Sequence, residues 1–370
     1  MSLEKHSIAI VLGTRPEIIK LAPLMRECER RGLQYATIHT GQHYSQSLDT
    51  VFFDRLELPP PDRNLGIGSG RHGEQTGEMI AGIERVLLEG EFETVLVQGD
   101  TNSTLAGAIA ASKLDLSVGH VEAGLRSYDR KMPEEINRIL TDHVADHLFC
   151  PTEDAAKTLR REGIPSERIF VTGNTIVDAV ERNLELAERE SSTLANLGLV
   201  PYSYALVTAH RPENVDDPDR FADLLCGVDL VARALDVEAI YPIHPRAAET
   251  IERSELSVPE SIRLIDPLDY FDFLSLEHNA RLVLTDSGGV QEEACVLGVP
   301  CVTMRDSTER PETVAVDANR LVGTDPDAIL AGAHEMIARS GEWENPFGDG
   351  DAAPRILDAL TVRPTAEVTG

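Results

Sequence analysis

Lysine and long hydrophobic runs are both scarce in this sequence. Only five of its 34 basic residues are lysine, and no apolar run among its 370 residues approaches the roughly 18–20 needed to cross a bilayer. The N-terminus, MSLEKHSIAIVLG, has neither a basic segment followed by a long apolar one nor a cleavage site. We therefore expect a cytoplasmic protein that neither spans a membrane nor follows the secretory route.

Cysteine is also sparse, and its positions form no pattern. Cys28, Cys150, Cys226, Cys295 and Cys301 are an odd number, widely separated, with no C-x-x-C pair and no histidine at metal-ligand spacing. Such a distribution is typical of buried free thiols in a reducing compartment. The sequence therefore predicts no disulfide and no metal site.

Positive charge is short as well, because 63 acidic residues face 34 basic ones and the net charge is −29. This balance argues against a nucleic-acid or anionic-membrane surface, so the expected partners are small molecules. An acidic, lysine-poor surface keeps a protein hydrated and dispersed when salt screens charge repulsion. We expect a halophilic source, and such a protein should lose its fold and activity in dilute buffer without added salt.

Short runs rich in Val and Ile alternate with helical patterns twice along the chain, which predicts βαβ units and parallel sheets buried on both faces. The predicted strands are Ser7–Leu12, Tyr35–His39, Thr94–Gln98, Ser117–Val121, His147–Cys150 and Ile169–Val171, then Tyr204–Thr208, Val237–Pro242, Ile262–Ile265, Leu282–Thr285 and Pro300–Thr303. We predict an α/β protein with two Rossmann-like doubly wound domains, 1–173 and 174–352, facing a cleft. A C-terminal helix and tail, 353–370, is expected to pack on the first domain.

The first predicted strand leads into GTRPEIIK, where Arg15 and Lys20 lie near a helix N-terminus. Two cations beside unpaired backbone N–H groups favour an anion such as phosphate, although both could be solvated helix charges. The segment is not a Walker A loop, and no G-x-G-x-x-G fingerprint follows the strand. Bound NAD is therefore not indicated.

Carboxylates follow the next strands of the first half. Asp100 ends the strand in QGDTNSTL, Glu122 ends the strand in GHVEAGLRS, and Glu134 lies in the first turn of a helix that Pro133 opens, with Arg138 four residues later. Each could be an ordinary cap or dipole partner. Clustered carboxylates raise one another's pKa, however, so that one can serve as acid and another as base.

The second half offers a histidine and a glycine-rich turn. His210 and Arg211 follow a strand in TAHRPEN, and His244 ends the next strand with weaker support. In TDSGGVQEEA the N–H groups of Ser287, Gly288 and Gly289 can approach a diphosphate, with Glu293 placed for a ribose. Phe273 could stack on a base, or be buried in the core.

Seven motifs in one order, GTRPEIIK, QGDTNSTL, GHVEAGLRS, MPEEINR, TAHRPEN, TDSGGVQEEA and MRDSTERPE, resemble the non-hydrolysing UDP-N-acetylglucosamine 2-epimerase family. The resemblance implies a glycosyltransferase-B fold, a homodimer, and interconversion of UDP-GlcNAc and UDP-ManNAc by elimination and return of UDP, without a cofactor. It implies catalytic roles for Asp100, Glu122, Glu134 and His210. It implies substrate-binding roles for Arg15, Lys20, Arg138, Phe273, Ser287, Gly288, Gly289 and Glu293.

Many bacterial members of that family bind a second UDP-GlcNAc as an activator, and Gln42, Gln46, Arg211 and His244 resemble the residues that do so. Activation of this kind would appear as a lag when UDP-ManNAc is the only substrate. Four other functions stay open at this stage. They are a hydrolysing 2-epimerase, a 2-epimerase of a UDP-2,3-diacetamido uronic acid, a glycosyltransferase of the same fold, and a sensor that only binds its ligand.

Overall fold

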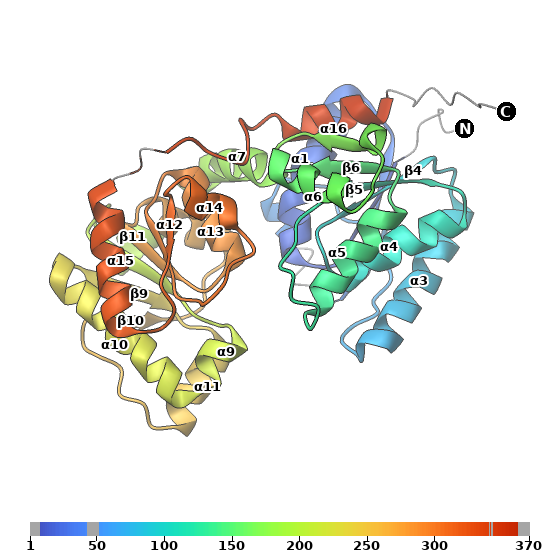
Figure 1. Ribbon diagram of the computed structural model, residues 1–370. Coiled ribbons are helices and arrows are strands. Elements are labelled where there is room, and N and C mark those ends of the chain that lie inside the picture. The colour runs from blue at the N-terminus through green and yellow to red at the C-terminus, as the bar shows by residue number, and fades with distance from the viewer. Residues whose placement is uncertain (1–7, 43–51, 340, 342, 362–370) are drawn as a thin grey trace. The chain divides into compact units, whose positions relative to one another are not determined.

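The protein forms two compact α/β units (Figure 1). The structure, a computed structural model, describes residues 8–42, 52–339, 341 and 343–361. The first unit comprises residues up to 179 together with those from 347 onward, and the second comprises 180–346. The chain passes from one unit to the other within helix α7 (Thr175–Glu190) and returns after Pro346.

The first unit is built on a seven-stranded parallel sheet in the order β3-β2-β1-β4-β5-β6-β7. Its strands are β1 (Ile8–Leu12), β2 (Tyr35–His39), β3 (Arg63–Asn64), β4 (Thr94–Gln98), β5 (Ser117–Val121), β6 (His147–Cys150) and β7 (Ile169–Val171). Its helices are α1 (Arg15–Arg31), α3 (His72–Glu89), α4 (Asn102–Lys113), α5 (Pro133–Val144), α6 (Glu153–Arg161), the start of α7, and α16 (Ala352–Thr361). Helix α16 packs on α1, and Arg31 pairs with Asp358 at 2.6 Å.

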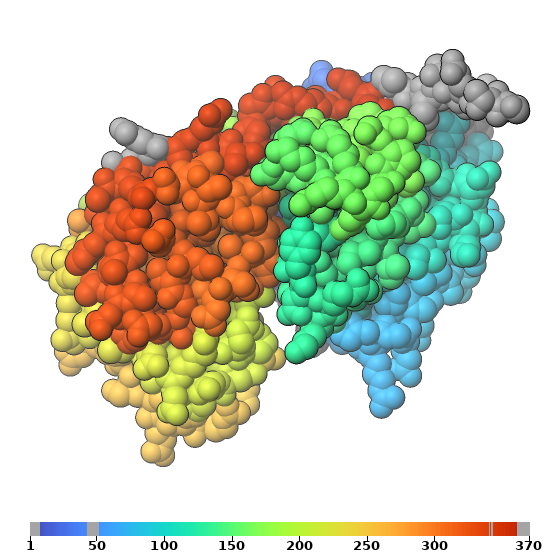
Figure 2. All heavy atoms as spheres, viewed as in Figure 1, coloured from blue at the N-terminus to red at the C-terminus, as the bar shows by residue number. Residues whose placement is uncertain are grey.

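The second unit is built on a six-stranded parallel sheet in the order β10-β9-β8-β11-β12-β13. Its strands are β8 (Tyr204–Thr208), β9 (Glu238–Pro242), β10 (Ile262–Ile265), β11 (Leu282–Thr285), β12 (Cys301–Thr303) and β13 (Asn319–Leu321). Its helices are α8 (Thr193–Leu197), α9 (Pro212–Val215), α10 (Pro218–Leu235), α11 (Pro245–Arg253), α12 (Tyr270–His278), α13 (Gly288–Leu297), α14 (Pro311–Ala315) and α15 (Pro326–Arg339). Helix α15 lies on the surface of this unit (Figure 2).

These two parallel sheets confirm the predicted doubly wound α/β fold. Strand β1 shows why the pattern is informative: all five residues of IAIVL are buried, as expected for a strand covered on both faces. Strands β9 and β12 begin one residue later than predicted, and the predicted first residue of β1, Ser7, lies outside the described residues. Strands β3 and β13 were not predicted, because neither contains an apolar run.

The cysteines are free, as predicted, and four of the five are buried. Cys226 differs, because it faces solvent on α10. In the described ranges no helix is long and apolar enough to cross a membrane. The same ranges hold no group of three or more His, Cys, Asp or Glu side chains that could bind a metal ion.

Candidate active site

The strand order of each sheet reverses between two neighbours, β1 and β4 in the first unit and β8 and β11 in the second. Ligands of doubly wound folds bind at this point, outside the carboxyl ends of the strands. In the first unit Gly13 follows β1, Asp100 follows β4 and Glu122 follows β5 directly. The sheet therefore brings the two strand-end carboxylates of the sequence prediction to one edge.

Glu122 is held by a cation rather than by another carboxylate. Its Oε2 atom forms an ion pair with the Lys20 ammonium and accepts a hydrogen bond from Gln98 Nε2 at 3.1 Å. The Lys20 and Glu122 side chains are only 9% and 7% exposed. Lys20 was expected to face phosphate, but in this structure its charge is compensated by Glu122.

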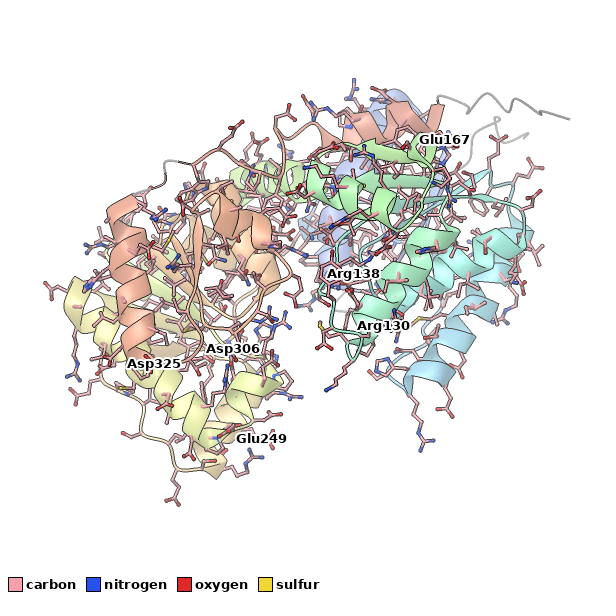
Figure 3. The ribbon with its side chains drawn as sticks, in the orientation of Figure 1. Arg130, Arg138, Glu167, Glu249, Asp306 and Asp325 are labelled. Atoms are coloured by element: carbon pink, nitrogen blue, oxygen red, sulfur yellow. The ribbon has the colours of Figure 1, made fainter. Side chains whose placement is uncertain are left out.

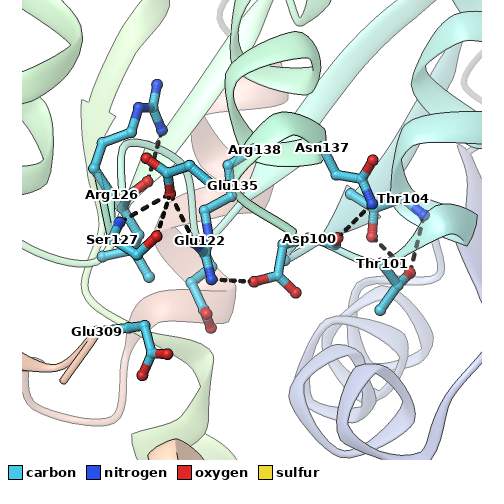
Figure 4. A network of polar contacts seen from close by, with 12 residues as sticks. Asp100, Thr101, Thr104, Glu122, Arg126, Ser127, Glu135, Asn137, Arg138 and Glu309 are labelled. Carbon is cyan, nitrogen blue, oxygen red and sulfur yellow. Dashed lines mark hydrogen bonds and ion pairs between the residues drawn. The ribbon is translucent and has the colours of Figure 1, made fainter. Parts of the chain in front are cut away.

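Arg138 on α5, labelled in Figure 3, joins two acidic side chains (Figure 4). It donates to Asp100 Oδ2 at 2.5 Å and to Glu135 Oε2 at 2.9 Å. Asp100 thus has its own cation, as Glu122 does. The cluster predicted from the sequence is a set of carboxylate–cation pairs rather than of carboxylates facing one another.

The glutamate that pairs with Arg138 differs from the one that the spacing suggested. Residues three and four apart both lie beside each other on a helix, so Glu134 and Glu135 were both in reach. Glu135 is buried and accepts the backbone N–H groups of Ser127 and Tyr128 at 2.8 and 3.0 Å, whereas Glu134 is exposed. Burial raises the pKa of Glu135, but the hydrogen bonds from Ser127 and Arg138 outweigh it and the net pKa is lowered.

Gly13 allows a close approach between the loop after β1 and helix α4. A Cβ atom at Gly13 would lie 2.1 Å from Ser103 Oγ and 2.2 Å from Thr40 Oγ1, so a larger residue would displace two hydroxyls that are hydrogen-bonded to each other. The φ of Gly13 is not in the left-handed region, and the neighbouring hydroxyls are the reason for a glycine here.

The first turn of α1, which follows this loop, contains one buried acid and one exposed cation. Glu17 accepts the Gly13 N–H at 2.9 Å and the Thr101 hydroxyl at 2.6 Å, which ties the loop to the start of α4. Burial raises the pKa of Glu17, and these hydrogen bonds offset it only in part. Arg15 is exposed, with its guanidinium 5.7 Å from the centre of the Phe52 ring. Arg15 is accessible to an anion in a way that Lys20 is not.

At the switch point of the second unit, His210 lies against Asp286, which follows β11. The Nδ1 atom of His210 is 3.1 Å from Asp286 Oδ1, and Asp286 also accepts the backbone N–H of His210 at 3.0 Å. Burial raises the pKa of Asp286, but the hydrogen bonds and the charge of His210 lower it by more, so the net pKa is below its usual value. A buried carboxylate thus orients the predicted catalytic histidine, which is 42% exposed.

The glycine-rich turn begins α13, with Ser287 at its N-cap. The N–H groups of Gly288 and Gly289 lie in the first turn, where they have no partner within the helix. A Cβ at Gly288 would approach nothing closer than 3.7 Å, and one at Gly289 nothing closer than 3.9 Å. These are ordinary contacts with Glu309 Oε2 and Ser287 Oγ, and the free amides of a helix N-terminus are the groups that bind an anion.

Glu293 lies one turn further on and is almost fully buried. Tyr270 and Glu277, both from α12, lie near enough to feel its charge: burial, and then the charge of Glu293, raise the pKa of Tyr270. Glu277 is fully buried; its burial and the nearby charge of Glu293 raise its pKa well above the ordinary value. Phe273, proposed for the base, is half-buried and packs against a core cluster of the second unit, so part of its side chain is already covered.

The residues assigned to an activator site do not all lie in one unit. Gln42 is in the first unit, where its Oε1 atom accepts the Ser103 hydroxyl at 2.7 Å. Arg211 and His244 are in the second, with the His244 ring 5.7 Å from that of His210. Burial, then the neighbouring charges of His210 and Arg246, lower the pKa of His244. Gln46 lies outside the described residues.

Sequence reasoning missed an ion-pair group in the second unit. Glu309 accepts both arms of the Arg305 guanidinium, at 2.8 and 3.0 Å, and lies 3.5 Å from Arg211 Nη2. Both Arg305 and Glu309 belong to MRDSTERPE, a segment noticed only for its resemblance. Its alternating acids and arginines were a signal, but they gave no indication of which residues pair.

The Glu309 group should make stability depend on pH. Burial raises the pKa of Glu309, but the Arg305 hydrogen bonds and the Arg211 charge lower it to about 2. A carboxyl group whose pKa is lower in the folded than in the unfolded protein stabilises the fold at pH values above its unfolded pKa. This stabilisation is lost as the pH falls towards the folded pKa. We expect Glu309→Gln to lower the free energy of unfolding at neutral pH by about 3 kcal/mol, with a difference that shrinks below about pH 4.5.

Thermal unfolding of wild type and variant across this pH range measures the difference. Glu335→Gln is the matched control, because Glu335 pairs with Arg339 at 2.8 Å but is 35% exposed. We expect less than about 1 kcal/mol from that exposed pair at any pH. A Glu309→Gln effect that is equally large at about pH 3 would contradict the role of the ionised carboxylate.

Two open parallel sheets with polar and charged side chains at their switch points define a doubly wound α/β protein of the ligand-binding class. Comparison with known families narrows this class. The family model described as UDP-N-acetylglucosamine 2-epimerase matches residues 26–361. The chain belongs to this family.

Individual relatives agree with the family match. UDP-N-acetylglucosamine 2-epimerase of Methanocaldococcus jannaschii is 51% identical, over 96% of this chain and 98% of its own. Its crystal structure, in complex with UDP-GlcNAc and UDP, superimposes with a TM-score of 0.87 over 96% of this chain and 99% of that one. UDP-2,3-diacetamido-2,3-dideoxy-D-glucuronate 2-epimerase of Pseudomonas aeruginosa is 41% identical, over 95% and 99% of the two chains.

Proposed function

We propose that this protein interconverts UDP-GlcNAc and UDP-ManNAc by inverting C2 of the sugar. The observation that carries the proposal is the arrangement of Asp100 and Glu122, which follow adjacent strands of the first sheet and each contact a cation. Two separately held carboxylates suit a reaction that removes a proton and returns it. The M. jannaschii relative at 51% identity is named UDP-N-acetylglucosamine 2-epimerase, and its crystal structure contains UDP-GlcNAc and UDP. Both facts support the same reaction for this chain.

The proposed route is elimination followed by addition. A carboxylate removes the C2 proton, the C2–H electron pair becomes the C1–C2 double bond, and the bond from C1 to the UDP oxygen breaks. UDP then adds back to C1 while a proton reaches C2 from the other face. Oxidation states are unchanged overall, so no redox cofactor is needed. Asp100, Glu122 and Glu134 are assigned to the proton transfers, and His210 to the departure and return of the diphosphate.

Substrate binding is assigned to residues of both units. We assign the diphosphate to the N–H groups of Gly288 and Gly289, which have no partner within α13, and to the exposed Arg15. The Ser287 N–H donates to Thr285 Oγ1 at 2.9 Å, so its assignment to the diphosphate rests on the family resemblance. Glu293 is assigned to the ribose and Phe273 to the uracil. Lys20 and Arg138 contribute by holding Glu122 and Asp100, and their assignment to the phosphates rests on the family resemblance alone.

The finer features of the family stay proposals. We propose the non-hydrolysing reaction, a homodimer, a cytoplasmic location and, from the net charge of −29, a halophilic source. The P. aeruginosa relative at 41% identity supports a second candidate, a UDP-2,3-diacetamido uronic acid as substrate. Both candidates use the same C2 chemistry.

Incubation with UDP-GlcNAc in deuterated water tests the proposal. Deprotonation at C2 must place deuterium at C2 of the recovered UDP-GlcNAc and UDP-ManNAc, which NMR and mass spectrometry detect. Recovery of UDP-sugars without deuterium would reject the mechanism. Free ManNAc and UDP would instead indicate the hydrolysing reaction, and exchange only with UDP-2,3-diacetamido-2,3-dideoxy-D-glucuronate would favour the second candidate.

A further inference from the structure

A buried histidine and a buried aspartate contact the two loops that carry the strand-end carboxylates Asp100 and Glu122. His120 is on β5 and Asp142 is on α5, and both are 0% exposed. The His120 Nδ1 atom is 2.7 Å from Asp142 Oδ1, and its Nε2 atom is 2.8 Å from the carbonyl oxygen of Gly99. Gly99 directly precedes Asp100 and has a φ of 74°.

Asp142 reaches the second carboxylate loop with its other oxygen. Asp142 Oδ2 accepts the Arg126 guanidinium at 2.7 Å and the Gly124 N–H at 3.3 Å. Both residues belong to the loop after β5 that begins with Glu122, where Glu122 and Gly124 have φ values of 70° and 85°. A single aspartate therefore contacts the loop of Glu122 directly and the loop of Asp100 through His120.

The hydrogen-bond pattern determines where the protons are. A carbonyl oxygen only accepts, so Nε2 of His120 donates to Gly99. The Asp142 carboxylate accepts from the Arg126 guanidinium and the Gly124 N–H through Oδ2, and it likewise accepts from His120 Nδ1 through Oδ1. Both ring nitrogens of His120 therefore carry hydrogen. Glu162 completes the group by pairing with Arg126 at 2.6 Å, and the four charges alternate in sign.

Helix α5 connects this group to Asp100 by a second route. Arg138, one turn before Asp142, donates to the Asp100 carboxylate, and Asn137 donates to the Asp100 carbonyl oxygen at 2.9 Å. The backbone before Asp100 and the side chain of Asp100 are thus fixed from the same helix. We propose that His120 and Asp142 are positioning residues that set the distance between Asp100 and Glu122. This inference rests on the proposed function.

The test compares two replacements of His120 that keep different halves of its contacts. The amide of His120→Gln can reach the position of Nε2 and donate to Gly99, whereas that of His120→Asn can reach only Asp142. We expect His120→Asn to lower kcat for C2 exchange by about 100-fold, as small misplacements of catalytic groups do. The kcat of His120→Gln should be about tenfold higher than that of His120→Asn. In both variants KM and the affinity for UDP should change less than about threefold.

His147→Asn is the matched control. His147 is half-buried on the neighbouring strand β6, and its Nδ1 atom is 3.3 Å from the Ser117 hydroxyl at the start of β5, away from the carboxylate loops. It should keep normal kcat. Near-normal exchange in His120→Asn, or a parallel loss of kcat, UDP affinity and thermal stability, would overturn the inference.

A measurement on the wild-type protein covers the case in which the variants do not fold. NMR of protein with ¹⁵N-labelled histidine should show one histidine with slowly exchanging hydrogens on both ring nitrogens. Buried His39 cannot give that signal, because its Nδ1 atom accepts the Gly41 N–H at 3.1 Å. Absence of the signal would overturn the inference. Absence of C2 exchange in wild type would reject the proposed function instead, so the two failures are distinguishable.

Discussion

Replacing Asp100 with asparagine is expected to reduce deuterium incorporation at C2 of UDP-GlcNAc by about 1,000-fold or more, while the affinity for UDP changes less than about threefold. The asparagine oxygen can still accept the hydrogen bond that Arg138 donates at 2.5 Å, and Glu135 still compensates the charge of Arg138. The loop should therefore keep its shape. What the variant loses is a group that can take up and release a proton.

Asp154→Asn serves as the control for this prediction. Asp154 is on α6 of the same unit, is exposed, and pairs with Lys157 at 2.8 Å, so its replacement makes the same chemical change away from the strand ends. We expect normal exchange from it. Near-normal turnover of Asp100→Asn would show that Asp100 takes no part in proton transfer. An equal loss of UDP affinity would show that the residue acts in binding instead.

The strands were predictable because their local pattern agrees with their environment. A run such as IAIVL is buried on both faces and has no other plausible place than a central parallel strand. Strand β13, Asn319–Leu321, has an asparagine and an arginine in three positions and pairs only with β12 at the edge of the sheet. Its strand structure comes from the neighbouring strand and not from its own composition.

The strand-end positions of Asp100, Glu122 and His210 could be predicted, but their partners could not. Asp286 lies 76 residues after His210, and the two meet because β8 and β11 are adjacent in the second sheet. That adjacency is a property of the topology and leaves no trace in the local sequence. In the same way, the anion-binding interpretation of Lys20 could not reveal that Glu122, 102 residues later, would face it.

Replacing Glu122 with glutamine is expected to abolish C2 exchange and also to destabilise the first unit. Glu122 accepts hydrogen bonds from the Lys20 ammonium and from Gln98, and glutamine removes the negative charge that faces the buried Lys20 ammonium. Breaking a buried pair in this way costs about 3–5 kcal/mol. We expect the free energy of unfolding to fall by that amount, and exchange by about 1,000-fold. Denaturant unfolding and the deuterium assay measure the two effects separately.

The double variant Lys20→Met, Glu122→Gln separates catalysis from stability. Removing both charges leaves no uncompensated ion, and apolar replacements of buried pairs are often neutral or stabilising. Stability should therefore recover to within about 1–2 kcal/mol of wild type while exchange stays lost. Recovery of exchange together with stability would mean that Glu122 serves only to neutralise Lys20. If stability stayed low in the double variant, the ion pair would not be the reason that the single variant is destabilised.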